Sequence, residues 1–381
     1  MNDTLLSVEA AAEADEDIVR LCIPCRILAI CLYSILSVIA IVGNSLIVLM
    51  IVYFRRLHTP TNVLILNLAI ADLLISLLCM PFSYWHVIIF DDQRWVFGAL
   101  FCKLFAYLQA TAVFLSSWTL VVISFDRFMA IMFVMSPWLR LTRRRAILLV
   151  LITWTFSLVM ALPLLFVNRT FQDELNGVTI CQERWDELTQ FFGPDTQIMH
   201  TYTTVVFALQ YCMPLLVLVI TYTFIGIKMW NSRVPGIDQS ENSRCLMQER
   251  HDSVKKLIPM VLLVSALYAG CWLPQNLLMN IMLTYHPSIA SHPYILYMWW
   301  IAHTIAMLHS IVNPFIYYTR NQKFREGFTY FLRFLPCIEF HGFHLLNDSN
   351  RTHAVRIVNM VAYMPVTGGK KVEDSKSSFS G

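Results

Sequence analysis

The sequence predicts an all-α protein: a bundle of seven membrane-spanning helices followed by a short amphipathic helix on the membrane surface. Hydrophobic residues make up 57% of the 381 residues and charged residues only 14%, well below the roughly 25% that is usual in soluble domains. The mean hydropathy is +0.58, and the apolar residues form long runs. This composition predicts a membrane protein. A net charge of +3 is too small for a nucleic-acid binder, so we expect no nucleic-acid partner.

Seven apolar runs are each long enough to cross the hydrocarbon layer, which takes roughly 20 residues of helix. They are too long for the strands of a membrane barrel, which have about 10 residues each. The seven spans are expected at 27–53, 62–86, 100–133, 146–167, 201–229, 256–284 and 294–318. After the last span, residues 321–333 mix basic and aromatic side chains, a pattern typical of a helix that lies against membrane lipid.

Charged residues indicate which way the chain crosses the membrane. If the N-terminus is outside, the outer segments hold 6 of the 28 basic residues and 14 of the 25 acidic ones. Lys and Arg collect on the cytoplasmic side, so we expect this orientation in the plasma membrane. The chain then divides into an outer tail (1–26), a membrane domain with the surface helix (27–333) and a cytoplasmic tail (334–381). The outward sequon at Asn2 is expected to carry a glycan.

Two charged positions stand inside the expected spans, where insertion scales put the cost of a charge at about 2.5–3.5 kcal/mol. Asp72 on the second span is either an acid held neutral by burial or part of a cation site. That site would hold sodium and would be completed by Ser116, Ser310 and Asn313. Asp126 and Arg127, near the inner end of the third span, are either a local ion pair or a switch that releases Arg127 toward a cytosolic partner.

Seven motifs fall in order along the spans, one on each. They are Asn44 in Gly43-Asn44-Ser45, Leu68-Ala69-Ile70-Ala71-Asp72, Asp126-Arg127-Phe128, Trp154, Pro214, Cys271-Trp272-Leu273-Pro274 and Asn313-Pro314-Phe315-Ile316-Tyr317. In these motifs the chain resembles the rhodopsin-like (class A) G-protein-coupled receptors over residues 27–333. The resemblance implies a receptor and not an enzyme, with no cofactor beyond an allosteric sodium ion at Asp72. It also implies a heterotrimeric G protein as the cytosolic partner.

The resemblance assigns roles to several cysteines. Cys102 would form a disulfide with Cys181 in the oxidising exterior, which would tie the second outer loop to the third span. Cys337, just after the surface helix, would be palmitoylated. Cys22 and Cys25 form a Cys-x-x-Cys in the outer tail. A redox motif is not favoured there, and an extra disulfide stays open.

For activation, the resemblance implies a moving ring and a cytosolic cleft that opens for the G protein. The residues concerned are Trp272 for the ring and Arg127, Tyr222 and Tyr317 for the cleft. Val254 stands near the inner end of the sixth span, where the family often has an acid that pairs with the arginine, so we expect raised basal signalling. Phosphorylation sites for arrestin recruitment are expected in the tail, at Ser375, Ser377, Ser378 and Ser380.

The residues that set the ligand class favour a peptide. Amine receptors carry an acid where this chain has Gln109, and opsins carry a lysine on the seventh span, where residues 294–318 have none. Gln109 and the run 303–307 resemble neuropeptide Y and short neuropeptide F receptors, whose peptides end in an amidated aromatic or Arg-aromatic pair. By this resemblance Gln109 and His303 would hydrogen-bond the amide. The peptide's ring would pack against Trp272, Tyr107 and Phe207.

Several alternatives stay open. The sixth-span stretch 280–284 lacks the acid that neuropeptide Y receptors usually place there. Glu183 in the second outer loop is either a substitute partner for a ligand arginine or solvated surface. A tachykinin-, galanin- or allatostatin-like peptide receptor remains an alternative, as does an orphan receptor with a non-peptide ligand. Analogy with neuropeptide Y receptors favours inhibitory G proteins, whereas analogy with tachykinin receptors favours Gq.

Overall fold

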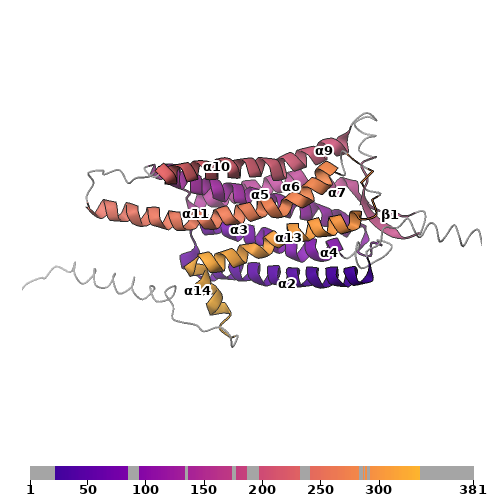
Figure 1. Ribbon diagram of the computed structural model, residues 1–381, viewed down its shortest axis with the longest axis horizontal. Helices are drawn as coiled ribbons and strands as arrows, with labels where there is room; N and C mark the ends of the chain where they lie inside the picture. Colours follow the sequence, from indigo (N-terminus) through magenta and orange to yellow (C-terminus); the bar gives the residue numbers. More distant parts are fainter. Residues whose placement is uncertain are drawn as a thin grey trace, which may run out of the picture.

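Seven long helices lie side by side in the computed structural model, which confirms the predicted all-α membrane bundle (Figure 1). The structure describes residues 22–84, 94–133, 136–173, 177–186, 197–231, 241–282, 286, 288–289 and 292–334. The expected glycosylation site Asn2, the palmitoylation site Cys337 and the tail serines lie outside the described residues.

Each predicted span corresponds to one helix or to a short series of helical segments. The helical segments are α2 (Ile23–Tyr53), α3 (Pro60–Leu74), η2 (Ile75–Cys79), α4 (Met80–Tyr84), α5 (Gly98–Met132), α6 (Arg143–Ala161), α7 (Leu164–Val167), α9 (Ile198–Phe207), η5 (Ala208–Cys212), α10 (Met213–Asn231), α11 (Glu241–Asn276), η6 (Leu277–Met282), α13 (Ile295–Arg320) and α14 (Gln322–Phe331). Short 3-10 turns, η1 (Arg55–Leu57) and η4 (Pro137–Leu139), follow α2 and α5 on the inner side. The first span begins at Ile23 and not at residue 27, because Cys22 caps it and a proline occupies its first turn.

Local sequence explains where the helices begin and how closely two of them approach. Thr59 and Thr142 cap α3 and α6 by accepting hydrogen bonds from the backbone N–H three residues on. Gly43 lies where α2 meets α13, and a Cβ atom there would come within 2.9 Å of Pro314. The glycine therefore allows the two helices that carry the Asn44 and Asn313 motifs to pack together.

Three π-helical turns interrupt the spans in their middle or outer parts. They are η2 just before Met80-Pro81, η5 just before Met213-Pro214, and η6 three residues after Pro274. A proline removes a backbone donor and its ring displaces the preceding turn, and wide turns of this kind recur at functional sites. The outer half of the bundle is thus less regular than the inner half.

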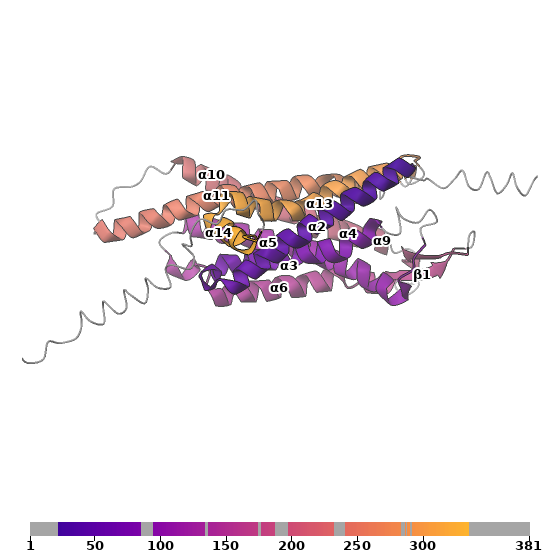
Figure 2. The ribbon, with the colours of Figure 1, turned by 90° about the horizontal axis from the view of Figure 1, so that it is seen from below.

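At the inner end, α14 turns away from the axis of α13, as both ribbon views show (Figures 1 and 2). Its buried residues are Phe324, Gly327 and Phe328, and Phe324 stacks on Tyr317 of α13 at 5.4 Å between ring centroids. The exposed face carries Lys323 and Arg325. This agrees with the predicted amphipathic surface helix.

At the outer end, the second outer loop forms a hairpin that the all-α prediction did not include. Strands β1 (Asn168–Gln172) and β2 (Thr179–Glu183) pair antiparallel, with Thr170 opposite Cys181. Cys181 is bonded to Cys102 near the start of α5, so the predicted disulfide is confirmed and holds the hairpin over the bundle. Trp95 of the first outer loop, 4% exposed, donates its backbone N–H to Thr179 O at 2.7 Å.

Candidate functional site

Arg127 lies near the inner end of α5 and is buried. Its guanidinium pairs with the carboxylate of Asp126 and donates to the hydroxyl of Thr61 at the start of α3. The Thr61 hydroxyl in turn donates to Asp126 Oδ2 at 3.3 Å. The charge of Arg127 is therefore neutralised inside the protein, and a partner that uses this guanidinium must first displace Asp126.

A cavity of about 1010 Å³ opens beside Arg127 at the inner end. It is bounded by η1, the first turns of α3, the inner parts of α5, α11 and α13, and the start of α14. Its charged lining residues are Arg56, Arg127, Arg320, Lys323 and Glu326. Basic residues therefore outnumber acidic ones in the cavity lining.

The two tyrosines expected at the cytosolic cleft take different positions. Tyr317, which is 3% exposed, lines the cavity. Tyr222 on α10 does not belong to the cavity lining; its hydroxyl lies 3.4 Å from Ser265 Oγ on α11. The structure thus brings Arg127 and Tyr317 together at one cavity and keeps Tyr222 on the neighbouring helix pair.

Asp72 is fully buried in the middle of the bundle. Asn313 Nδ2 donates to its Oδ2 at 2.6 Å, and Ser310 Oγ donates to its Oδ1 at 3.3 Å. The Ser116 hydroxyl is buried on α5 without a hydrogen-bond partner among the described residues. A buried carboxylate and a hydroxyl are the kinds of oxygen atom that a small hard cation prefers, so these residue types suit the expected sodium ion.

His309 also faces this site, and the sequence analysis missed it. Its Nε2 lies 3.5 Å from Asp72 Oδ1, and its Nδ1 lies 2.6 Å from the backbone oxygen of Ala306. The imidazole ring also packs against Trp272 at 5.4 Å and against Tyr268 at 5.6 Å. A titratable side chain within a membrane span is itself a signal of function, and it could have found this residue next to Ser310.

Three of the expected ligand contacts are half-buried in the outer part of the bundle. Gln109 and Tyr107 lie on α5, and Phe207 ends α9. Phe207 stacks on Tyr211 at 6.0 Å, and the Tyr211 hydroxyl donates to Ala269 O on α11. These residues come from two helices, and their role as ligand contacts stays a prediction.

His303 is 3% exposed on α13. Its Nδ1 lies 2.8 Å from the hydroxyl of Tyr33 on α2, and Trp299 stacks on its ring at 4.7 Å. Burial beside a neighbouring helix gives this histidine a structural role. Its other nitrogen, Nε2, has no hydrogen-bond partner among the described residues, so one polar atom remains for a ligand.

Helices α11 and α13 carry four buried polar atoms that lack partners among the described residues. The atoms are Trp272 Nε1, Gln275 Oε1, Trp300 Nε1 and His303 Nε2. They include donors, an acceptor and an imidazole nitrogen. Buried polar groups are almost always hydrogen-bonded in native proteins, to protein or to ordered water. Of these four residues, sequence reasoning missed Gln275 and Trp300.

Glu183 ends strand β2, two residues after the disulfide-bonded Cys181. The residue as a whole is exposed on the rim, but its carboxylate accepts a hydrogen bond from Trp185 Nε1 at 3.1 Å. Burial by the surrounding protein atoms raises the pKa of this carboxyl above its usual value, and the hydrogen bond from Trp185 offsets part of the shift. An acidic side chain therefore lies at the outer rim, close to the third span.

Comparisons with known proteins agree with this arrangement. Residues 43–317 match the family described as 7 transmembrane receptor (rhodopsin family). The chain belongs to this family. Similar proteins are Neuropeptide receptor 22 of Caenorhabditis elegans, 53% identical over 93% of this chain and 81% of the relative, and the RYamide receptor of Tribolium castaneum, 35% identical over 81% of each. The Substance-P receptor of Aquarana catesbeiana is 29% identical over 91% of this chain and 82% of the relative.

Family membership confirms the predicted rhodopsin-like receptor of the neuropeptide type and its place as a multi-pass protein of the plasma membrane. The receptor's own ligand contacts and its sodium site remain predictions. The structure brings Asp72, Ser310 and Asn313 into direct contact. It places His303 against Tyr33, where its Nδ1 is already engaged.

Proposed function

We propose that this receptor binds an extracellular neuropeptide that ends in an amidated Arg-aromatic pair, and that it passes the signal to a heterotrimeric G protein. The observation that carries the proposal is the set of unpartnered buried atoms on α11 and α13, with His303 Nε2 and Gln275 Oε1 among them. A carboxamide presents both an N–H₂ donor and a C=O acceptor. It therefore complements an acceptor and a donor that the helices leave unpaired.

Charge and relatives support the same ligand. The outer segments hold 14 acidic residues against 6 basic ones, which attracts a basic peptide and speeds its encounter with the receptor. Glu183 at the rim is the proposed partner of the ligand arginine, and Gln109 is the proposed amide contact on α5. Two similar proteins are RYamide receptors by name. That name denotes a peptide with an arginine and a terminal amide, the two groups assigned here to Glu183 and Gln109.

Signal transfer runs through the middle of the bundle. Trp272 contacts His309, and His309 contacts Asp72. A ligand that displaces the Trp272 ring would therefore move His309, which in turn would change the surroundings of the buried Asp72 carboxylate. A sodium ion held by the Asp72 carboxylate and the Ser116 hydroxyl would neutralise the buried charge there. At the inner end, Arg127 would leave Asp126 and enter the cavity that receives the G protein. Arrestin recruitment to the phosphorylated tail belongs to the same proposal.

A ligand panel tests the proposed class. Cells that express the receptor with a promiscuous G protein are challenged with amidated Arg-Tyr, Arg-Phe and tachykinin-type peptides, and calcium release is recorded. We expect a response at nanomolar doses to the Arg-aromatic amides, with a loss of potency of roughly tenfold or more in Gln109→Ala at equal surface expression.

The second candidate, a tachykinin-type ligand, is favoured by the similarity to the Substance-P receptor. It predicts a response to amidated tachykinin-type peptides that lack the Arg-aromatic ending. A Glu183→Gln variant separates the two candidates, because only the Arg-aromatic ligand needs a counter-charge at the rim. Silence across the panel, with the receptor at the cell surface, would overturn the amidated-peptide proposal.

A further inference from the structure

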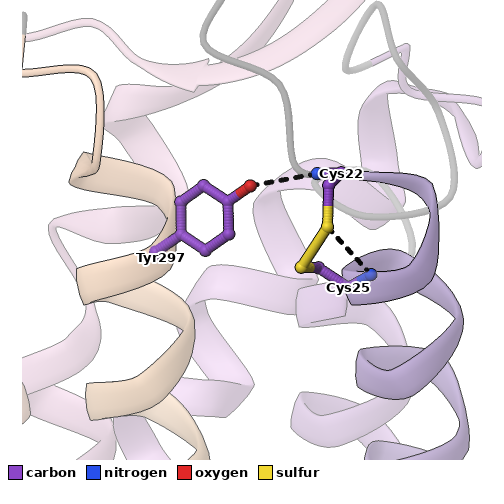
Figure 3. The surroundings of a disulfide bond; sticks show 3 residues. All are labelled: Cys22, Cys25 and Tyr297. Atoms are coloured by element: carbon purple, nitrogen blue, oxygen red, sulfur yellow. Dashed lines mark hydrogen bonds between the residues drawn. A yellow bond between two sulfur atoms is a disulfide. The ribbon is translucent and has the colours of Figure 1, made fainter.

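The outer end of α2 is closed by a disulfide between Cys22 and Cys25, which the sequence left open. Cys22 Sγ accepts a hydrogen bond from the backbone N–H of Cys25 at 3.2 Å, so the bridge also caps the helix. The backbone N–H of Cys22 donates to the hydroxyl of Tyr297 on α13 at 3.1 Å. Figure 3 shows this chain of contacts, from the tyrosine ring through Cys22 to Cys25.

This contact joins the N-cap of α2 to the outer part of α13. Tyr33 also links the two helices, deeper in the bundle, through His303. Both links therefore act on the helix that carries His303 and Trp300, two of the residues with unpartnered buried atoms. The position of Cys22 decides whether the outer link can form.

The two disulfides differ in the properties that govern exchange with thiols. Cys102 is fully buried and its bridge spans 79 residues of sequence, whereas Cys22 is exposed and its bridge spans 3. A bridge that closes a long loop removes far more freedom from the unfolded chain, and folding therefore protects it more strongly. Exchange also requires access of a thiolate to a disulfide sulfur. The Cys22–Cys25 bridge is the accessible and weakly protected one.

Helix geometry favours the reduced form of the same site. The N-terminus of a helix stabilises negative charge, and a thiolate at this place has a lowered pKa and a raised reactivity. Cys22 occupies the cap position and its sulfur already accepts an N–H from the first turn. The sequence alone did not favour a redox motif, because it does not show the cap or the tyrosine link.

We propose that Cys22 and Cys25 form a thiol-exchange site at which small extracellular monothiols open and close the link between α2 and α13. A monothiol, as its thiolate, attacks the exposed Sγ of Cys22, and the Cys22–Cys25 bond breaks as Cys25 leaves as a thiolate. A second monothiol attacks the mixed disulfide at its non-protein sulfur and releases Cys22. One protein disulfide and two monothiols thus become one protein dithiol and one small disulfide, and the reverse steps close the bridge.

Opening the bridge frees the first turn of α2, so Cys22 no longer holds its N–H against Tyr297. The outer turns of α13 then lose their link to the N-cap of α2 at Tyr297. The loss of a single neutral hydrogen bond should favour local opening of the outer turns of α13 by roughly two- to tenfold. The consequence for peptide affinity rests on the proposed function, but the exchange and the release of the helix do not.

The test uses the full-length receptor in membranes with reduced glutathione as the monothiol, and it needs no ligand. Differential alkylation and mass spectrometry record which cysteines open, and hydrogen exchange records protection of residues 295–303. We expect Cys22 and Cys25 to open while Cys102 and Cys181 stay bonded, with protection of 295–303 falling roughly two- to tenfold. Oxidised glutathione should restore both readouts.

Two variants keep the test decisive. Cys22→Ser with Cys25→Ser should show the lowered protection of the reduced receptor and no response to glutathione. Tyr297→Phe keeps the disulfide and should show the same lowered protection before and after reduction. The proposal is overturned if Cys22–Cys25 opens only together with Cys102–Cys181. It is also overturned if reduction of the wild-type bridge leaves exchange at 295–303 unchanged.

Discussion

The two ends of the helix bundle treat their buried polar groups differently. At the inner end, Arg127 is paired with Asp126 and Thr61, beside a cavity of about 1010 Å³. In the outer half, Gln275 and His303 keep buried atoms that lack partners among the described residues. Because buried polar atoms are nearly always satisfied, we propose that a bound ligand pairs with those of the outer half. The inner half instead holds a satisfied pair that its partner must separate.

The largest effect is expected from the long disulfide that holds the outer half together. Replacing its cysteines, with Cys102→Ser and Cys181→Ser, should abolish surface delivery and peptide response, because losing such a bridge costs about 2–5 kcal/mol. Cell-surface labelling measures the delivery. The matched pair Cys22→Ser with Cys25→Ser should reach the surface at nearly the wild-type level, and an equal loss in both pairs contradicts the distinction between the two bridges.

Arg127→Ala separates the inner end from the outer end. Truncating one partner of a buried charge pair at an interface typically costs about 2 kcal/mol or more of binding free energy. Loss of the proposed contact between Arg127 and the G protein should therefore lower G-protein activation by roughly tenfold or more. Peptide binding should stay within about threefold, since the ligand contacts lie in the opposite half. Nucleotide exchange on purified G protein and peptide binding to the same membranes give the two numbers. A comparable loss of peptide affinity would break the proposed division of the molecule.

Peptide affinity should depend on pH through Glu183 at the outer rim, with a smaller change than for the two preceding variants. The pKa of Glu183 lies above the ordinary value because of burial, so its charge is lost at a higher pH than for a surface glutamate. Affinity for an Arg-containing peptide should therefore fall by up to about fivefold between about pH 7 and about pH 5. Glu183→Gln should show the lower affinity at both pH values. Equal pH dependence in variant and wild type assigns the titration to another group.

The smallest effect is expected at Val254, whose side chain lies outside the part of the chain that the structure describes. The resemblance to the rhodopsin-like receptors implies that an acid at this position pairs with Arg127 and stabilises the resting state. Val254→Glu should therefore lower ligand-free signalling by about two- to threefold, with Val254→Gln as the uncharged control. The basal activity of both variants is compared at matched surface expression. No decrease in the glutamate variant removes the proposed link between Val254 and basal signalling.

Sequence reasoning succeeded where function depends on the spacing within one helix. Asp126 and Arg127 are adjacent, and Ser310 and Asn313 are one turn apart, so their relation to each other follows from helix geometry. It was incomplete where function depends on contacts between helices. The pairing of His303 with Tyr33 bridges residues 270 positions apart, and the hairpin that carries Glu183 forms in a loop with no strong alternation. His309 was not predicted, because the interpretation of charged side chains within the spans included acids and arginine but not histidine.

We propose that the outer half recognises a carboxamide through polar groups that the helices leave unpaired. A binding comparison of one Arg-Tyr peptide, as the amide and as the free acid, on wild type and on Gln109→Ala is the decisive experiment. We expect the amide to bind about 10- to 100-fold more tightly to the wild type, and the difference to shrink to within about threefold in Gln109→Ala. Equal affinity of the amide and the free acid for the wild-type receptor would contradict the claim.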